Sequence, residues 1–174
     1  MELRSVEELM DLLYAGRGAV APDDPGPRTG PEHGPRPGPA GNGSGSGSGS
    51  DDLYGHALRT AALLRRRHPA DKELQVAGLV HGIGRLLGPG AGSGPAGRAA
   101  QAAAAVRGLL GERVGRLVRE RAADGDRPPG EDVLALRLAA EEARAVGSAA
   151  GVLEDWRTLL ELVAARSARL GAVD

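Results

Sequence analysis

The strongest constraint on the fold comes from residues 51–87, where apolar side chains recur with helical spacing. The first half forms one apolar helical face from Leu53, Ala57, Ala61 and Leu64. A break at His68–Ala70 follows, and Asp71 is a suitable N-cap for a second helix. The second helix is apolar on most sides, at Leu74, Val76, Ala77, Leu79, Val80 and Ile83. The stretch therefore predicts a tight helical hairpin whose second helix is largely buried.

Two histidines stand at matching ends of this hairpin, His56 early in the first helix and His81 late in the second. Antiparallel helices joined by so short a connection bring these ends together, so we expect the two imidazoles to be close. Neighbouring imidazoles can begin a metal site, act as general acid and base, or be satisfied core residues without a function. The sequence leaves all three interpretations open.

Apolar residues also recur with helical spacing in the rest of the chain outside residues 18–50. Ser5 and Glu8 match a capping box ahead of an N-terminal helix within residues 1–17. Later helices are predicted at about 96–110, in a short segment after Gly111, at about 131–146 and at about 153–170. The last has a predicted buried stripe of Leu153, Trp156, Leu159, Leu160, Leu162 and Val163. The predicted fold class is all-α, with one helical domain over residues 51–174 and the first helix packed on it.

Residues 18–50 have a different composition, rich in Pro and Gly and then in alternating Gly and Ser. Such a segment cannot bury enough apolar surface to offset the entropy lost on ordering. We therefore predict a disordered linker inserted between the first helix and the rest of the domain. His33 lies inside this segment and is expected to be solvated.

The composition argues against several classes of protein. The absence of cysteine excludes disulfides and thiolate chemistry. The chain has no long apolar run and no signal-peptide pattern at its start, so we expect a cytoplasmic protein without a membrane partner. A net charge of -1 and 2% aromatic residues disfavour a nucleic-acid partner. The expected partner is a small-molecule ligand or another protein, and the alanine-rich segment 99–105 suits a homodimer seam.

The residues around the two histidines resemble the HD-domain superfamily. HALRTAAL at His56 and AGLVHGIGRLL at His81 look like the HD-domain mixed-valent di-iron oxygenases, relatives of the phosphonate-cleaving and inositol oxygenases. LLGERVGRLV follows in the same order. The resemblance implies an HD-domain-like helical bundle, and it implies a di-iron centre to which His56 and His81 would contribute.

The chain departs from the family's remaining ligand pattern. By this resemblance a carboxylate or a histidine would be expected where the chain has Gly82, Arg98, Arg121 and Ala140. Arginine is permanently cationic and cannot ligate a metal. We therefore expect no metal cofactor, and we interpret these positions as vestigial. A shifted carboxylate at Glu141 or Glu142 would instead leave a site for a single iron.

Three functions follow from these positions. The favoured prediction is a pseudoenzyme that binds a small molecule or a protein partner and lacks the family's oxygenase or phosphohydrolase activity. An alternative is a metal-independent cyclase, lyase or isomerase, in which His56 and His81 act as acid and base and Arg98 and Arg121 anchor an anionic substrate. A third is a mononuclear iron oxygenase. Against the second stands the simpler interpretation that both arginines face solvent or pair with nearby carboxylates.

Overall fold

The structure is a computed structural model that describes residues 2–17, 53–88, 94–123, 128–145 and 151–171. Within these ranges it is helical and contains no strand. The elements are α1 (Val6–Ala15), α2 (Leu53–Arg67), α3 (Lys72–Val80), the 3₁₀ helix η1 (Ile83–Arg85), α4 (Pro95–Leu110), α5 (Glu112–Arg121), α6 (Glu131–Ala145) and α7 (Glu154–Gly171). The all-α prediction is confirmed for this part of the chain. The predicted disordered segment, residues 18–50, lies outside it.

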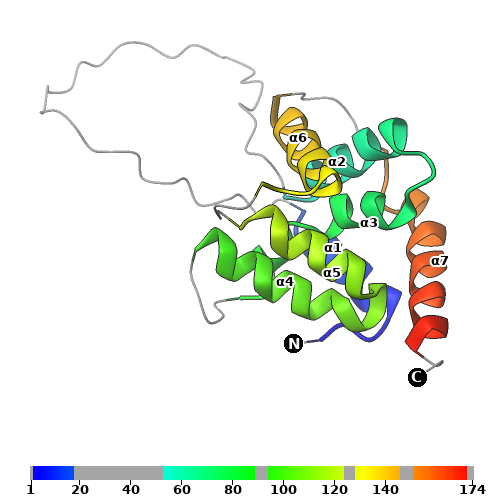
Figure 1. Cartoon of the computed structure of the whole chain (residues 1–174). Coiled ribbons are helices and arrows are strands. Elements are labelled where there is room, and N and C mark those ends of the chain that lie inside the picture. The colour runs from blue at the N-terminus through cyan, green and yellow to red at the C-terminus, as the bar shows by residue number, and fades with distance from the viewer. Residues whose placement is uncertain (1, 18–52, 89–93, 124–127, 146–150, 172–174) are drawn as a thin grey trace, which may run out of the picture.

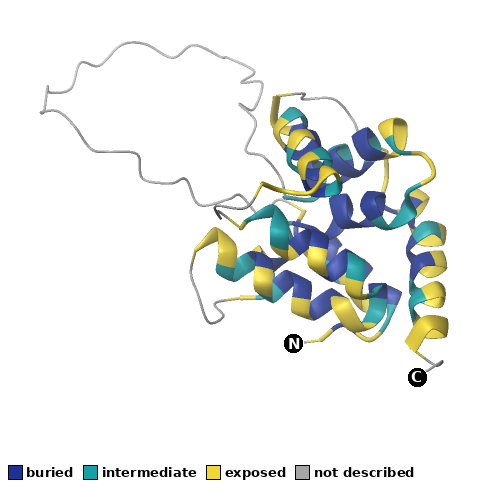
Figure 2. Ribbon diagram, in the orientation of Figure 1, coloured by how far each residue is buried: buried dark blue, intermediate teal, exposed yellow. Residues whose placement is uncertain are grey.

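The helix α3 is the centre of the bundle. Every residue from Leu74 to Val80 is buried, which confirms the sequence prediction of a largely buried second helix. The helix packs on α2, α5, α6 and α7, and it lies between the α2–α6 pair and the α4–α5 pair (Figure 1). Figure 2 shows that its surface is covered, whereas the outer faces of the surrounding helices are exposed. A helix that is apolar all round is stable only when its neighbours cover it in this way.

Side-chain caps begin α1 and α3 where the sequence predicts them. The Ser5 hydroxyl accepts a hydrogen bond from the Glu8 amide at 3.2 Å, and the Glu8 carboxylate accepts one from the Arg4 amide at 2.7 Å. The Asp71 carboxylate accepts from the Leu74 amide at 3.0 Å. These bonds satisfy backbone donors that have no partner inside the helix.

The helices α4 and α5 approach closely because small residues face the contact. A Cβ at Gly115 of α5 would lie only 3.3 Å from the Ala103 carbonyl of α4. The alanine-rich segment suggested as a dimer seam is buried here within a single chain, at Ala99, Ala102, Ala103 and Ala105. Its close packing is thus used inside the bundle, and homodimerisation stays a prediction.

The helix α7 covers one side of the bundle and packs on α1, α3 and α4. Trp156 is 1% exposed and confirms its predicted place in the core. The Arg65 guanidinium carbon lies 4.7 Å from the centre of the Trp156 ring, a cation–π contact. The prediction is wrong for Leu162, which is 52% exposed. It lies on the face of α7 that no other described helix covers.

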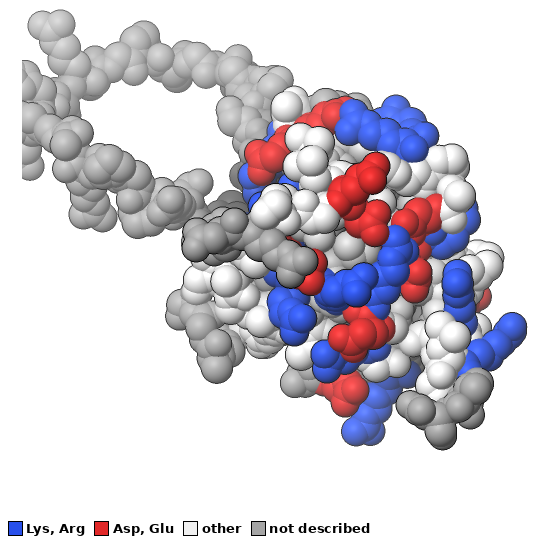
Figure 3. Space-filling view, in the orientation of Figure 1, with Lys and Arg blue, Asp and Glu red and all other residues white. Residues whose placement is uncertain are grey.

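No helix in the described part of the chain has both the length and the apolar character needed to cross a membrane. On the face seen in Figure 3, Lys and Arg side chains alternate with Asp and Glu and do not form a separate basic patch. The expectations of no nucleic-acid partner and of a cytoplasmic location stay predictions.

Candidate functional site

The structure brings the two histidines into contact. His56 lies in the first turn of α2 and is 8% exposed, and His81 is the C-cap of α3 and is 7% exposed. Their ring centroids are 5.3 Å apart and the ring planes meet at 73°, an edge-to-face arrangement. The sequence prediction placed His81 inside the second helix, but the helix ends one residue earlier, at Val80. The short hairpin nevertheless brings the two rings together, as expected.

The protonation of His81 follows from its surroundings. Its Nδ1 atom lies 2.7 Å from the Gly78 carbonyl oxygen. Because a carbonyl only accepts, Nδ1 carries the proton and Nε2 keeps its lone pair. Burial lowers the pKa of His81 well below its usual value of 6.5, and the positive charge of Arg121 and the neighbouring His56 lower it further. His81 is therefore neutral at pH 7 and can accept a proton or a hydrogen bond at Nε2.

Arg121, the last residue of α5, acts on His81 through its charge. Its side chain is half-buried, and its Nε atom is buried without a hydrogen-bond partner. Burial, together with the nearby charges of Arg144 and Arg85, lowers the pKa of Arg121 to about 10, and Glu141 partly offsets them. The guanidinium stays charged at pH 7. The structure thus places one of the two sequence-predicted arginines where its charge acts on His81.

Arg98, the other predicted arginine, lies in the first turn of α4 and is half-buried. Its charge acts on Arg85 of η1, whose pKa is lowered first by burial and then by Arg98 and Arg144. Sequence reasoning missed Arg85 and Arg144. The first stands four residues after His81, which is a signal for proximity, whereas nothing in the sequence of α6 singles out the second.

Two glycines next to His81 have different surroundings. A Cβ at Gly82 would meet no atom within 4 Å, so this position borders open space. A Cβ at Gly84 would overlap the Arg98 carbonyl. Gly84 therefore lets η1 pack against the first turn of α4, and this packing brings Arg85 and Arg98 together.

The described residues do not fit a di-iron centre. Over the described ranges, no group of three or more His, Cys, Asp or Glu side chains is placed to hold a metal ion. Ala140, at the vestigial ligand position in α6, is buried and offers no donor atom. The Glu141 side chain is 68% exposed and binds Arg144 at 2.7 Å, and Glu142 binds Arg67 at 2.5 Å. The mononuclear iron interpretation therefore has no third ligand among these residues.

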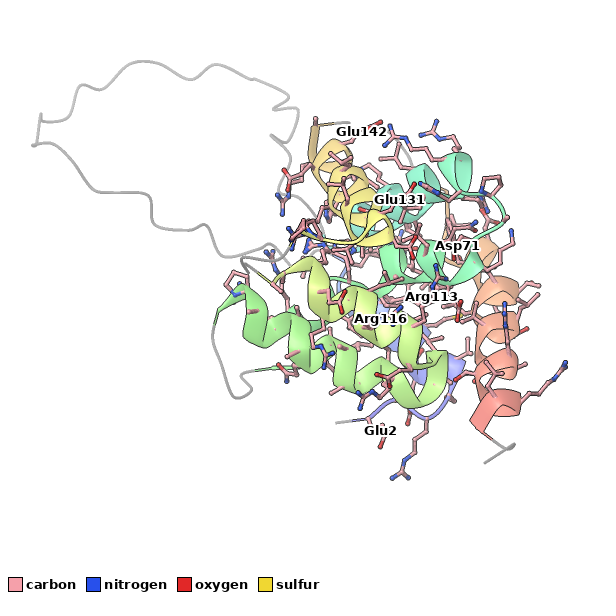
Figure 4. All side chains as sticks on the ribbon, in the orientation of Figure 1. Glu2, Asp71, Arg113, Arg116, Glu131 and Glu142 are labelled. Carbon is pink, nitrogen blue, oxygen red and sulfur yellow. The ribbon has the colours of Figure 1, made fainter. Side chains whose placement is uncertain are left out.

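A hollow of about 720 Å³ lies away from the histidines, beside α5 and α6. Arg116 and Glu131, labelled in Figure 4, belong to its lining, and His56 and His81 do not. Arg137, also in the lining, already donates hydrogen bonds at 2.7–3.0 Å to the carbonyls of Glu120, Arg121 and Ala123. In this hollow the Nε and one terminal nitrogen of Arg137 are thus already used by backbone carbonyls, and we take the histidine pair as the candidate site.

Comparison with known proteins does not identify the chain: no family model, no curated protein and no solved structure matches it. The relationship to the HD-domain superfamily therefore stays a prediction that rests on the sequence motifs.

Proposed function

We propose that this protein is a degenerate HD-domain-like pseudoenzyme that binds a small molecule at the His56–His81 pair without metal-based oxygenase chemistry. The observation that supports this best is the contact of two buried imidazoles beside the Arg121 cation. A cation at this place repels a divalent metal, because like charges interact strongly where water is excluded. The Nε atom of Arg121 is buried without a hydrogen-bond partner, and a ligand that accepts a hydrogen bond from it would offset the cost of burying that donor.

A metal-independent enzyme is the second candidate, and the protonation of His81 favours it. A neutral imidazole with an available Nε2 lone pair can act as a general base, and the adjacent His56 can act as the matching acid. In this proposal Arg98 and Arg121 anchor an anionic substrate, and the reaction is of the cyclase, lyase or isomerase type. A protein partner stays a further prediction.

A thermal-shift screen tests the favoured proposal. Neutral, cationic and anionic small molecules are compared on the wild-type chain, on His81→Gln and on His68→Gln. The control is matched because His68 belongs to the same hairpin but lies at its turn, away from the pair. We expect some compounds to raise the melting temperature of the wild type and of His68→Gln but not that of His81→Gln.

The iron content of the protein, measured after expression with added iron, tests the oxygenase alternative. Stoichiometric iron that is lost in His81→Gln and kept in His68→Gln would contradict the proposal and favour an oxygenase. Conversion of a bound compound that stops in His81→Gln, without iron, would favour the second candidate. We also expect that Gly82→Asp alone does not create oxygen uptake, because the other vestigial positions still lack donors.

A further inference from the structure

The end of the bundle that holds the histidine pair also gathers four arginines from four different elements. They are Arg85 of η1, Arg98 of α4, Arg121 of α5 and Arg144 of α6, and we call them the arginine cluster. The charges of Arg144 and Arg85 lower the pKa of Arg121, and those of Arg98 and Arg144 lower the pKa of Arg85. The charges of two members, Arg121 and Arg144, also lower the pKa of His81.

Arg121 is not neutralised by the carboxylate next to it. The repulsion from Arg144 and the repulsion from Arg85 each exceed the attraction from Glu141. The Glu141 side chain is 68% exposed and is already bound by Arg144. A half-buried guanidinium held among other cations raises the free energy of the folded protein, since like charges repel. A bound anion would remove this cost.

The hydrogen bonds of Arg121 point to the same conclusion. Its Nε atom is buried and has no hydrogen-bond partner. A buried donor without an acceptor costs about 1–3 kcal/mol, so folded proteins rarely keep one without a reason. A guanidinium recognises planar or tetrahedral oxyanions through paired N–H donors, and Nε is one of those donors.

There is also space beside the cluster. Gly82 borders open space, with no atom within 4 Å of the position its Cβ would occupy. The Gly82 carbonyl accepts the Arg85 amide at 3.1 Å, so this open position lies at the start of the turn that carries Arg85. His81, the preceding residue, offers its Nε2 lone pair on the same segment. The opening is thus one residue from His81 and three residues from Arg85 along the chain.

We infer that the ligand of the His56–His81 site is a small molecule with a compact dianionic group, a phosphate monoester or a dicarboxylate, bound by the arginine cluster with Arg121 as its principal contact. This inference rests on the proposed function, since it specifies the ligand of the same site. We expect a dianion because Arg121 and Arg85 both lie among other cations, whereas Arg144 is already paired with Glu141.

Calorimetric titration at constant ionic strength tests the inference with inorganic phosphate, malonate and chloride as probes. Phosphate and malonate represent the two sources of a dianion, and chloride represents a simple monoanion. We expect at least one dianion to bind and chloride not to bind. Arg121→Gln should lower the affinity for the dianion about tenfold or more, because the substitution removes charged hydrogen bonds. Arg107→Gln, an exposed arginine at the other end of α4 that pairs with Glu112, should leave the affinity unchanged.

A second pair of variants keeps the test valid if Arg121→Gln fails to fold. Gly82→Asp and Gly82→Asn place side chains of nearly equal size in the open space beside the cluster, and the added negative charge of Gly82→Asp should weaken dianion binding more than the neutral Gly82→Asn does. Equal affinities in Gly82→Asp, Gly82→Asn and the wild type would overturn the inference. So would compounds from the thermal-shift screen that bind through His81 but are all neutral or cationic, and in that case the proposed function would stand. If no compound of any charge binds through His81, both fail.

Discussion

The two ends of α5 each carry a half-buried arginine, and the two arginines have opposite surroundings. Arg113, at the start, binds the carboxylates of Asp71, Glu73 and Asp132 at 2.6–2.9 Å. Figure 4 shows Arg113 beside Asp71. The hydrogen bond to Asp71 is the main cause that raises the pKa of Arg113. Arg121, at the other end, has cations around it and a lowered pKa.

This difference separates structural stabilisation from ligand binding. The carboxylates around Arg113 come from the starts of α3 and α6, so this arginine joins three helices. A cation whose partners are all within the protein has no need of a ligand. Arg121, in contrast, has cations around it and a buried Nε atom without a partner, and an external anion would supply the missing acceptor. We therefore expect the start of α5 to determine stability and its end to determine binding.

The largest expected loss of stability comes from Gly84→Ala, because the new methyl group overlaps the Arg98 carbonyl. We expect the free energy of unfolding to fall by about 3 kcal/mol, as is typical of severe overpacking. Chemical denaturation followed by Trp156 fluorescence measures it. Gly82→Ala is the matched control, since its methyl group enters open space and should change stability by no more than about 0.5 kcal/mol. Equal effects of the two variants would contradict the packing of η1 on α4.

Arg113→Met should lower the free energy of unfolding by about 2 kcal/mol, because three carboxylates lose a charged donor. The affinity for a dianion should not change, since this end of α5 is not part of the arginine cluster. Arg107→Met, which breaks the exposed pair with Glu112, should cost less than about 1 kcal/mol. A loss of dianion binding in Arg113→Met without a loss of stability would reverse the assignment of the two ends.

The stability of the protein should also fall in two separate pH ranges, one set by His81 near Arg121 and one set by Asp71 near Arg113. The folded pKa of His81 lies below its usual 6.5, so the unfolded chain takes up the proton first and stability falls as the pH drops below about 6.5. The folded pKa of Asp71 lies below 3.8, chiefly because Arg113 binds it. Its contribution is therefore complete above pH 3.8 and is lost as the pH falls further. A denaturation series from pH 8 to pH 3 measures both steps.

Substitutions assign the two steps. His81→Gln should remove the loss that begins near pH 6.5 and leave the loss below pH 3.8. Asp71→Asn should do the reverse, at the expense of overall stability because it weakens the cap of α3. A single step that both variants change equally would show that the two ends are not independent.

The smallest expected effect is that of Arg121→Gln on the stability of the ligand-free protein. Removal of one cation from the cluster should leave the free energy of unfolding unchanged or raise it by about 0.5 kcal/mol, because repulsion is relieved. Thermal and chemical denaturation of the ligand-free variant check this. A loss as large as that of Arg113→Met would show that Arg121 has a structural role.

Local signals explain which parts of the fold could be predicted from the sequence. Ser5 and Asp71 are recognisable as caps because the donors they satisfy lie three residues away. Trp156 and the buried surface of α3 follow from apolar spacing. Leu162 was predicted wrongly because spacing alone does not say how wide a face the neighbouring helices cover. The burial of α7 depends on α1, α3 and α4, which are distant in the sequence.

The candidate site was predictable to the extent that the hairpin defines it. The contact of His56 and His81 follows from a short connection between antiparallel helices. The arginine cluster depends on how η1, α4, α5 and α6 pack against one another, and no local sequence pattern encodes this packing. Arg144 in particular is one of many arginines that alternate with glutamates, and only the tertiary packing distinguishes it from the others.

The burial of α3 from Leu74 to Val80 has a consequence for motion at the site. The buried part of the helix exposes its amides to solvent only when the surrounding bundle opens, so the protection of these amides against hydrogen exchange should correspond to the free energy of global unfolding. His81 directly follows this helix, and its ring is bound to the Gly78 carbonyl within it. One wall of the site is therefore attached to the slowest-exchanging element of the molecule. We therefore expect movement that admits a ligand to come from the elements around α3 and not from α3 itself.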